Sequence, residues 1–326
     1  MSRSERGLPL RCTTLNMSWE ANTTKPIKHG TQFHNVQKDA RGIPLRWPLD
    51  NTVSRAYQKS ANAIIQTNPD IILLQEFSVS SVLDPSDVPL VAKNLFGKNY
   101  TVVATKLTFG HNTWYGNLIL ARTTLLNKFT FTDLQIVDFY SKMRGTFSEE
   151  RPLAAVIMAP TSNLSNPVML ICSVHSAHYQ NWGLEASTKR FKIIIESAMD
   201  YYKSKISPAK PSFKQMGFLF GGDLNTTQTC SWGQAAHFTC DNKETFEIKK
   251  TPSSILSQNT LTSDHWEQGP RDWIFGTSRM NPNTCIINSF TGSDHYALVA
   301  QTSASMATRK PFIDDAVFRS THPTAV

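Results

Sequence analysis

The strongest chemical signal in the sequence is the stretch FLFGGDLN at residues 218–225. An apolar run stops at two glycines and is followed at once by an acid and an amide, which predicts a buried strand that carries Asp223 and Asn225 to its end. The glycines would let a backbone, a metal or a phosphate come close where a Cβ would obstruct. Turns favour the same residue types, so the stretch alone is equally compatible with a strand that enters a turn.

Other strand ends carry polar groups as well, and this recurrence favours a shared site. Acids, amides and imidazoles stand at the ends of six predicted strands: Asn16, Glu76, His175, Asp223 with Asn225, Asp272, and Asp294 with His295. Any one of them would ordinarily be a cap or a turn residue. Six independent placements are hard to explain in that way, so we expect these side chains to meet in one hydrolytic site.

The residue types fit the hydrolysis of phosphate esters. Carboxylate oxygens suit Mg²⁺ or Mn²⁺, whereas a set of histidines and cysteines would indicate zinc. A carboxylate or a His–Asp pair can activate water, and a second imidazole can protonate the leaving oxygen. Phosphoryl transfer depends mainly on positioning and electrostatics, so amides such as Asn16 and Asn225 belong beside the phosphate.

The elements that must position these groups are mostly strands. Alternation and buried apolar runs predict strands at 8–15, 70–76, 100–106, 115–122, between 129 and 138, and at 151–158, 168–174, 218–223, 271–275, 285–290 and 296–301. Helical periodicity covers 53–67, 88–96 and 186–203. The polar segment from Asn225 to about Gly269 has no predicted strand. This pattern predicts sheets packed face to face with helices outside.

Composition narrows the class of protein and its partners. The chain has 326 residues, a formal net charge of +8 and five cysteines without a CxxC pair, which argues against a structural zinc site. The positive charge fits a nucleic acid or an anionic membrane surface. No signal peptide and no apolar run of membrane-spanning length is present, so we expect an intracellular protein. We also expect the protein to be a monomer.

A series of short motifs resembles a known family. The series is Leu15-Asn16, Leu74-Gln75-Glu76, Gly116-Asn117-Leu118-Ile119, Val174-His175-Ser176, Gly222-Asp223-Leu224-Asn225, Asp272-Trp273-Ile274 and Ser293-Asp294-His295. In order and spacing it resembles the endonuclease/exonuclease/phosphatase superfamily, the deoxyribonuclease I-like fold. The resemblance implies an α+β protein, a four-layer α/β/β/α sandwich of two mostly antiparallel sheets flanked by helices.

Domain boundaries follow from the extent of this resemblance and from composition. The matching motifs span residues 9–302, which we expect to form one domain after a flexible N-terminus at 1–8. A basic, aperiodic insertion at 20–52 leaves the predicted strand that ends in Asn16, and long loops of this kind are more often functional or disordered than idle. The tail at 303–326 has little periodicity, and we expect it to be disordered.

The resemblance implies a role for each motif residue. Glu76 would be the principal ligand of Mg²⁺ or Mn²⁺, with Asn16 and Asp294 beside it. Asp223 and Asn225 would orient or deprotonate the attacking water and hold the phosphate. Further roles fall to His295 as base or phosphate donor, Asp272 as its orienting acid, His175 as phosphate contact and proton donor, and Arg151 as a phosphate contact.

Two places depart from the deoxyribonuclease I pattern. In that enzyme a glutamate before the strand at 115–122 pairs with the histidine that resembles His175, whereas this chain has Trp114-Tyr115-Gly116-Asn117. We therefore expect Tyr115 or Asn117 to orient His175 and to line the substrate site. In addition, Ser263-Asp264-His265 imitates the motif at 293–295, but no strand pattern follows it, which predicts a loop.

Three functions remain open at this level. The first is a metal-dependent phosphodiesterase that cleaves DNA or RNA, favoured by the motif set and the positive charge. The second is a phosphohydrolase of inositol phosphates or sphingolipids with the same fold, for which basic loops would serve a membrane surface. The third is a catalytically silent binding module, because a fold alone does not establish activity.

Overall fold

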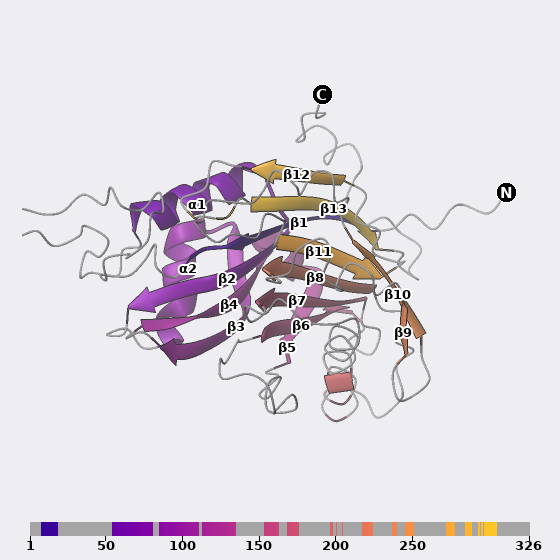
Figure 1. Cartoon of the computed structure of the whole chain (residues 1–326). Coiled ribbons are helices and arrows are strands. Elements are labelled where there is room, and N and C mark those ends of the chain that lie inside the picture. The colour runs from indigo at the N-terminus through magenta and orange to yellow at the C-terminus, as the bar shows by residue number, and fades with distance from the viewer. Residues whose placement is uncertain are drawn as a thin grey trace, which may run out of the picture.

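Two β-sheets packed face to face form the centre of the computed structural model (Figure 1). The structure describes residues 8–18, 54–80, 85–110, 113–134, 153–162, 168–175, 196–197, 200, 204, 217–223, 237–239, 245–250, 272–277, 284–288, 293, 295 and 297–304. Among these residues no helix has both the length and the apolar character needed to cross a membrane.

The first sheet has six strands in the order β12-β13-β1-β2-β4-β3. They are β1 (Leu8–Asn16), β2 (Ile71–Ser80), β3 (Tyr100–Gly110), β4 (Thr113–Arg122), β12 (Thr284–Asn288) and β13 (Ala297–Ala304). The pair β1–β2 is parallel, and the other neighbours are antiparallel. Helices α1 (Arg55–Gln66) and α2 (Val88–Phe96) cover the outer face of this sheet (Figure 1).

The second sheet has seven strands in the order β5-β6-β7-β8-β11-β10-β9. They are β5 (Phe129–Asp133), β6 (Leu153–Pro160), β7 (Met169–His175), β8 (Gly217–Asp223), β9 (His237–Thr239), β10 (Thr245–Lys250) and β11 (Asp272–Thr277). Only β7 and β8 pair in parallel among these strands. Two short helical elements, η3 (Pro85–Asp87) and α3 (Thr123–Leu126), complete the described elements.

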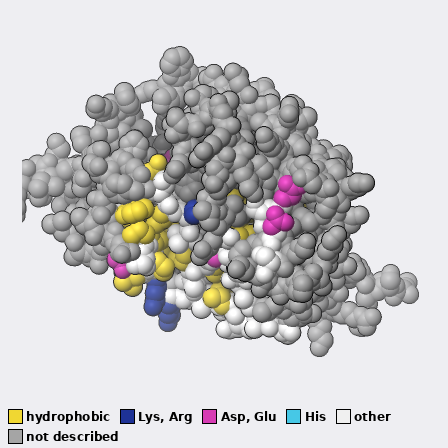
Figure 2. All heavy atoms as spheres, turned by 90° about the horizontal axis from the view of Figure 1, so that it is seen from below, with side chains coloured by type: hydrophobic (Ala, Val, Ile, Leu, Met, Phe, Trp, Pro, Cys, Tyr) yellow, Lys and Arg dark blue, Asp and Glu magenta, His cyan; other side chains and the backbone are white. Residues whose placement is uncertain are grey.

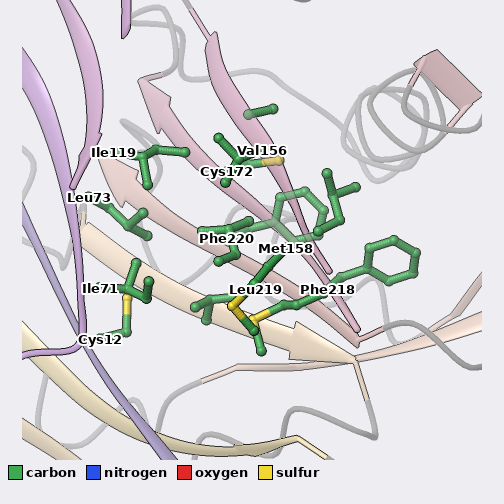
Figure 3. Close-up of a cluster of buried hydrophobic side chains, with 14 of the residues drawn as sticks. Cys12, Ile71, Leu73, Ile119, Val156, Met158, Cys172, Phe218, Leu219 and Phe220 are labelled. Carbon is green, nitrogen blue, oxygen red and sulfur yellow. The ribbon is translucent and has the colours of Figure 1, made fainter. Parts of the chain in front are cut away.

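The main core lies between the two sheets. Leu73 from β2 and Ile119 from β4 face Val156 and Phe220 from the second sheet (Figure 3). The alternate residues of β2, Ile72 and Leu74, face the other way and pack with α1 and α2. Because β2 contributes to both cores, its first four residues, 71–74, are all apolar.

The α+β sandwich predicted from the sequence is confirmed. The predicted helices at 53–67 and 88–96 correspond to α1 and α2, and each predicted strand has a counterpart. Strands β9 and β10 are an addition, because they lie in the polar segment for which no strand was predicted. Of the predicted helix at 186–203, the structure describes only helical residues Glu196, Ser197 and Asp200. The insertion at 20–52 and the tail beyond 304 lie outside the described residues.

A partly buried ion pair between Arg122 and Asp70 lies at the end of the first sheet that is remote from the C-terminus of β2. The Arg122 side chain donates from Nε to Asp70 Oδ1 at 3.1 Å and from Nη2 to the Pro69 carbonyl at 2.6 Å. The other Asp70 oxygen, Oδ2, accepts from the Arg11 backbone N–H at 2.9 Å. Burial raises the pKa of Asp70, and the positive charge of Arg122 opposes this effect.

We predict that Arg122→Leu lowers the free energy of unfolding by about 1.5–3 kcal/mol at neutral pH, because Asp70 then remains buried without this charged donor. Removing the cation raises the pKa of Asp70 further above its value in the unfolded chain. Asp70 in the folded variant therefore takes up a proton as the pH falls. The difference in the free energy of unfolding between the wild type and the variant becomes smaller as a result. Urea unfolding of both proteins at pH 7 and pH 5 measures this. If the variant loses as much or more free energy of unfolding at pH 5 as at pH 7, Arg122 does not lower the pKa of Asp70.

Candidate active site

The side chains that were predicted at strand ends and that the structure describes converge at one edge of the sandwich. In the first sheet, β1 ends at Asn16, which pairs with Gln75 in the parallel strand β2. In the second sheet, His175 at the end of β7 pairs with Asp223 at the end of β8. Parallel strands carry their carboxyl ends to the same edge, and each sheet has one parallel pair at this place. A 2.9 Å hydrogen bond from Asn16 Nδ2 to Asp223 Oδ2 then joins the two sheets.

Asp223 lies at the centre of this cluster and is only 2% exposed. Besides the amide of Asn16, its Oδ2 lies 3.7 Å from the Nε2 of His175 and 3.7 Å from the Nε2 of His295. These two distances are too long for direct hydrogen bonds. One carboxylate oxygen therefore has two imidazole nitrogens close to it.

His295 is held by a second acid. Its Nδ1 lies 2.7 Å from Oδ2 of the buried Asp272, and the backbone N–H of His295 donates to Ser293 Oγ at 3.0 Å. With Nδ1 as the donor to the carboxylate, the other ring nitrogen, Nε2, is the one that faces Asp223. Ser293 in turn donates to the backbone carbonyl of Asn16 at 2.6 Å, which ties this segment to the end of β1.

Glu76 reaches the cluster from an irregularity in β2. The pairing of β2 with β4 shifts register between Leu74 and Phe77, so Glu76 lies in a β-bulge. Its φ of 50° is in the left-handed region, which costs a residue with a Cβ about 1–2 kcal/mol. Its Oε1 lies 3.5 Å from His175 Nε2. Strained residues of this kind are concentrated at functional sites, where the surrounding structure holds them in place.

His175 lies between two acids, because its Nε2 faces both Glu76 and Asp223. The two residues predicted to orient it come from β4. Asn117 is fully buried, and its Nδ2 donates to the Ser173 carbonyl at 2.9 Å, so it holds β7 two residues before His175. Tyr115 is half-buried in β4, where it pairs with Ser78 of β2.

Beneath the cluster, a buried polar network links the two sheets. The side chain of Gln75 donates from Nε2 to Ser173 Oγ at 2.8 Å, and Ser173 Oγ donates to the Leu74 carbonyl at 2.8 Å. Thr14 donates from Oγ1 to Gln75 Oε1 at 3.2 Å. Thr14, Gln75 and Ser173 were not predicted from the sequence as positioning residues. The available signal was a glutamine in an otherwise apolar strand, because buried amides need partners.

The two glycines of the motif at 221–222 make room for protein atoms. A Cβ built on Gly222, whose φ is 151°, would overlap the backbone carbonyl oxygen of Val174 in the neighbouring strand. A Cβ on Gly221 would lie 2.6 Å from the terminal Cδ1 of Leu73 in the opposite sheet. The sequence predicted that a backbone, a metal or a phosphate lies close to these glycines. At Gly222 the close neighbour is backbone, and at Gly221 it is a side chain of the opposite sheet.

Three predicted site residues lie outside the described residues: Asn225, Asp294 and Arg151. The imitating motif at 263–265 also lies outside them. Within the part of the chain that the structure describes, no group of three or more His, Cys, Asp or Glu side chains is arranged to hold a metal ion. The carboxylates of Glu76 and Asp223 nevertheless lie close to the same imidazole nitrogen, and their oxygens are ligands that suit a hard divalent cation.

Comparisons with known proteins agree with this fold. A sequence model described as "Endonuclease/Exonuclease/phosphatase family" matches residues 34–295. The structure of an endonuclease/exonuclease/phosphatase from Bacteroides vulgatus aligns with a TM-score of 0.51 at 14% identity, over 91% of this chain and 99% of that one. Another from Beutenbergia cavernae aligns with a TM-score of 0.51 at 12% identity, over 91% and 72%. No curated protein sequence matches the chain.

We predict that the two glycines differ sharply in their tolerance of a methyl group. Gly221→Ala should lower the free energy of unfolding by about 1–3 kcal/mol, since the Leu73 side chain can turn away. Gly222→Ala should lower it by more than about 3 kcal/mol, because a backbone carbonyl in a paired strand cannot move independently and the φ disfavours a Cβ. Urea unfolding of the two variants compares them directly. Equal losses would show that the Val174 carbonyl is not the constraint.

Proposed function

The chain belongs to the endonuclease/exonuclease/phosphatase family, and within this family of phosphoester hydrolases we propose that it is a divalent-metal-dependent phosphodiesterase that cleaves DNA or RNA. The observation that carries the proposal is the environment of Asp223, whose Oδ2 is approached by the amide of Asn16 and by the Nε2 atoms of His175 and His295. This geometry supplies an acceptor and a donor of protons around one point.

In the proposed reaction, His295 and Asp223 prepare the attacking water. Asp272 Oδ2 accepts a hydrogen bond from the Nδ1–H of His295, with 2.7 Å between the two atoms. The lone pair is then on Nε2, which faces Asp223. A water held by Asp223 can lose its proton to this nitrogen as it attacks phosphorus. Asn16 donates to Asp223 and so fixes the carboxylate, and Asn225 is proposed to hold the phosphate.

We propose that His175 protonates the leaving oxygen. Its Nε2 lies 3.7 Å from the same Asp223 oxygen that His295 approaches, and the side chain is buried. One imidazole can therefore take a proton from water while the other gives one to the leaving group. Arg151 and Tyr115 are proposed as contacts for the substrate, and Asn117 supports His175 through the strand β7.

The oxygen ligands proposed for the metal are Glu76, Asn16 and Asp294. When bound there, Mg²⁺ or Mn²⁺ would polarise the phosphoryl oxygen and offset the charge of the transition state. Glu76 is suited to this role because its side chain is only 13% exposed and its Oε1 lies 3.5 Å from the imidazole nitrogen that Asp223 also approaches. Two carboxylates at one buried point favour a bound cation.

The preference for nucleic acid rests on the net charge of +8. In the face seen from below, the described Lys and Arg side chains stand beside acidic and apolar ones and form no continuous stripe (Figure 2). The basic residues of the insertion at 20–52 lie outside the described residues, and we propose them as the contacts with the phosphate backbone. The second candidate substrate class is an inositol phosphate or a sphingolipid, for which the same basic loop would bind anionic headgroups.

A cleavage panel tests the proposed function. Purified protein with Mg²⁺ or Mn²⁺ should hydrolyse at least one of plasmid DNA, single-stranded DNA, RNA and 5′-phosphotyrosyl DNA, and chelation by EDTA should abolish the reaction. Glu76→Gln, prepared in the same way, controls for contaminating nucleases and should be inactive. If all nucleic acids stay intact while inositol phosphates or sphingomyelin are cleaved, the second substrate class is correct.

Two variants test the roles of the Asp272–His295 pair. His295→Ala should lower kcat by roughly 10²–10⁴-fold, because the general base is lost. Asp272→Asn retains the imidazole but disturbs its orientation, and it should lower kcat by about 10–100-fold. Both are measured by steady-state kinetics on the substrate identified by the panel. If the two losses were reversed in order, Asp272 and not His295 would be the group that contacts the reacting atoms.

A further inference from the structure

The hydroxyl of Tyr57, in the first turn of α1, makes three contacts with the strand that carries Glu76. It donates to the backbone carbonyl of Glu76 at 3.0 Å and accepts from the backbone N–H of Ser78 at 2.9 Å. A third contact joins it to Ser78 Oγ at 3.1 Å. Because a carbonyl can only accept, the hydroxyl proton belongs to Glu76, and Ser78 Oγ is the donor in the third contact. All hydrogen-bonding positions of this hydroxyl are therefore used.

These contacts lie where backbone pairing with the first strand ends. Asn16 pairs with Gln75, and the Met17 N–H donates to the Gln75 carbonyl at 2.8 Å. The next residue of β2 is Glu76, which has a φ of 50° and lies within the register shift against β4. A side chain from a helix thus continues the bonding of β2 beyond the end of β1.

We propose that Tyr57 is a positioning residue for Glu76. By holding the Glu76 carbonyl and the Ser78 N–H on one oxygen, it spans the bulge and keeps the backbone of Glu76 in its left-handed conformation. That conformation directs the carboxylate toward His175, 3.5 Å away, instead of along the regular alternation of the strand. The inference rests on the proposed function, because it takes Glu76 as the metal ligand.

Tyr57 is itself held in place by its backbone and by its ring, as a positioning residue must be. Its backbone N–H donates to the Oγ of Ser54, the N-cap of α1, at 3.1 Å. Its ring lies 5.5 Å from the ring of Phe77, and the residue is fully buried. Burial also raises the pKa of its hydroxyl, so the proton donated to the Glu76 carbonyl is retained.

The test compares Tyr57→Phe with Tyr100→Phe. Tyr100 is a matched control, because it belongs to the same cluster of buried residues and its hydroxyl also donates to a backbone carbonyl, that of Pro69, at 3.1 Å. Both variants lose one buried hydroxyl, and we expect both to unfold at a lower temperature. Only Tyr57→Phe should bind Mn²⁺ more weakly, by roughly 10–100-fold in Kd measured by titration calorimetry, as found for partners that orient metal ligands.

The outcomes separate this inference from the proposed function. If the wild-type protein binds no Mn²⁺, the proposed metal-dependent function fails. If the wild type and Tyr57→Phe bind Mn²⁺ equally, the role of Tyr57 is wrong while the function stands. Hydrogen exchange gives an independent measure, because the amide of Ser78 should exchange faster in Tyr57→Phe but not in Tyr100→Phe. Equal exchange in all three proteins contradicts the proposal.

A milder variant covers the case in which Tyr57→Phe does not fold. Ser54→Ala removes the N-cap oxygen that holds the Tyr57 backbone but leaves the hydroxyl in place. It should weaken Mn²⁺ binding in the same direction and to a smaller extent. If Ser54→Ala unfolds at a lower temperature but binds Mn²⁺ with unchanged affinity, the start of α1 does not influence the position of Glu76.

Discussion

The geometry of the site depends on hydrogen bonds between the two sheets, and the hydroxyl of Ser173 makes two of them. Hydrophobic packing between the sheets is non-directional, so by itself it would let them slide by small amounts. The Ser173 hydroxyl accepts from Gln75 and donates to the Leu74 carbonyl, which sets β7 against β2 at one position. The next residue of β2 is Glu76, and two residues further along β7 is His175. Their 3.5 Å approach is therefore fixed from below, and buried networks with satisfied partners are rigid in this way.

The site itself belongs to neither sheet alone. Asn16 and Glu76 come from the first sheet, and His175, Asp223 and Asp272 come from the second. Small shifts between the sheets would change every distance between these two groups at once. The hydrogen bond from Asn16 to Asp223 and the hydrogen bond from Gln75 to Ser173 join the two sheets and act against such shifts.

The sequence was sufficient to predict most of the strands and the polar residues at their ends, because burial on two faces and polar strand ends leave clear patterns. The bulge at Glu76 could not be predicted, since it arises from a register shift with β4, far along the chain. Nor could the partner of Asn117, which depends on how the two sheets meet. The carbonyl beside Gly222 was not predictable either, because it depends on the pairing of β7 with β8. Strands β9 and β10 were missed because their apolar alternation is weak in a polar segment.

The position of β1 has a consequence for biosynthesis. It lies between β2 and β13, with Leu8 opposite Ala304, so one of the first described residues pairs with one of the last. During synthesis β1 is made nearly three hundred residues before β13, its second neighbour in the sheet. Contacts of such sequence separation slow folding. The edge of β1 that β13 later covers stays open throughout synthesis, and nascent chains with uncovered strand edges are substrates for chaperones and prone to association.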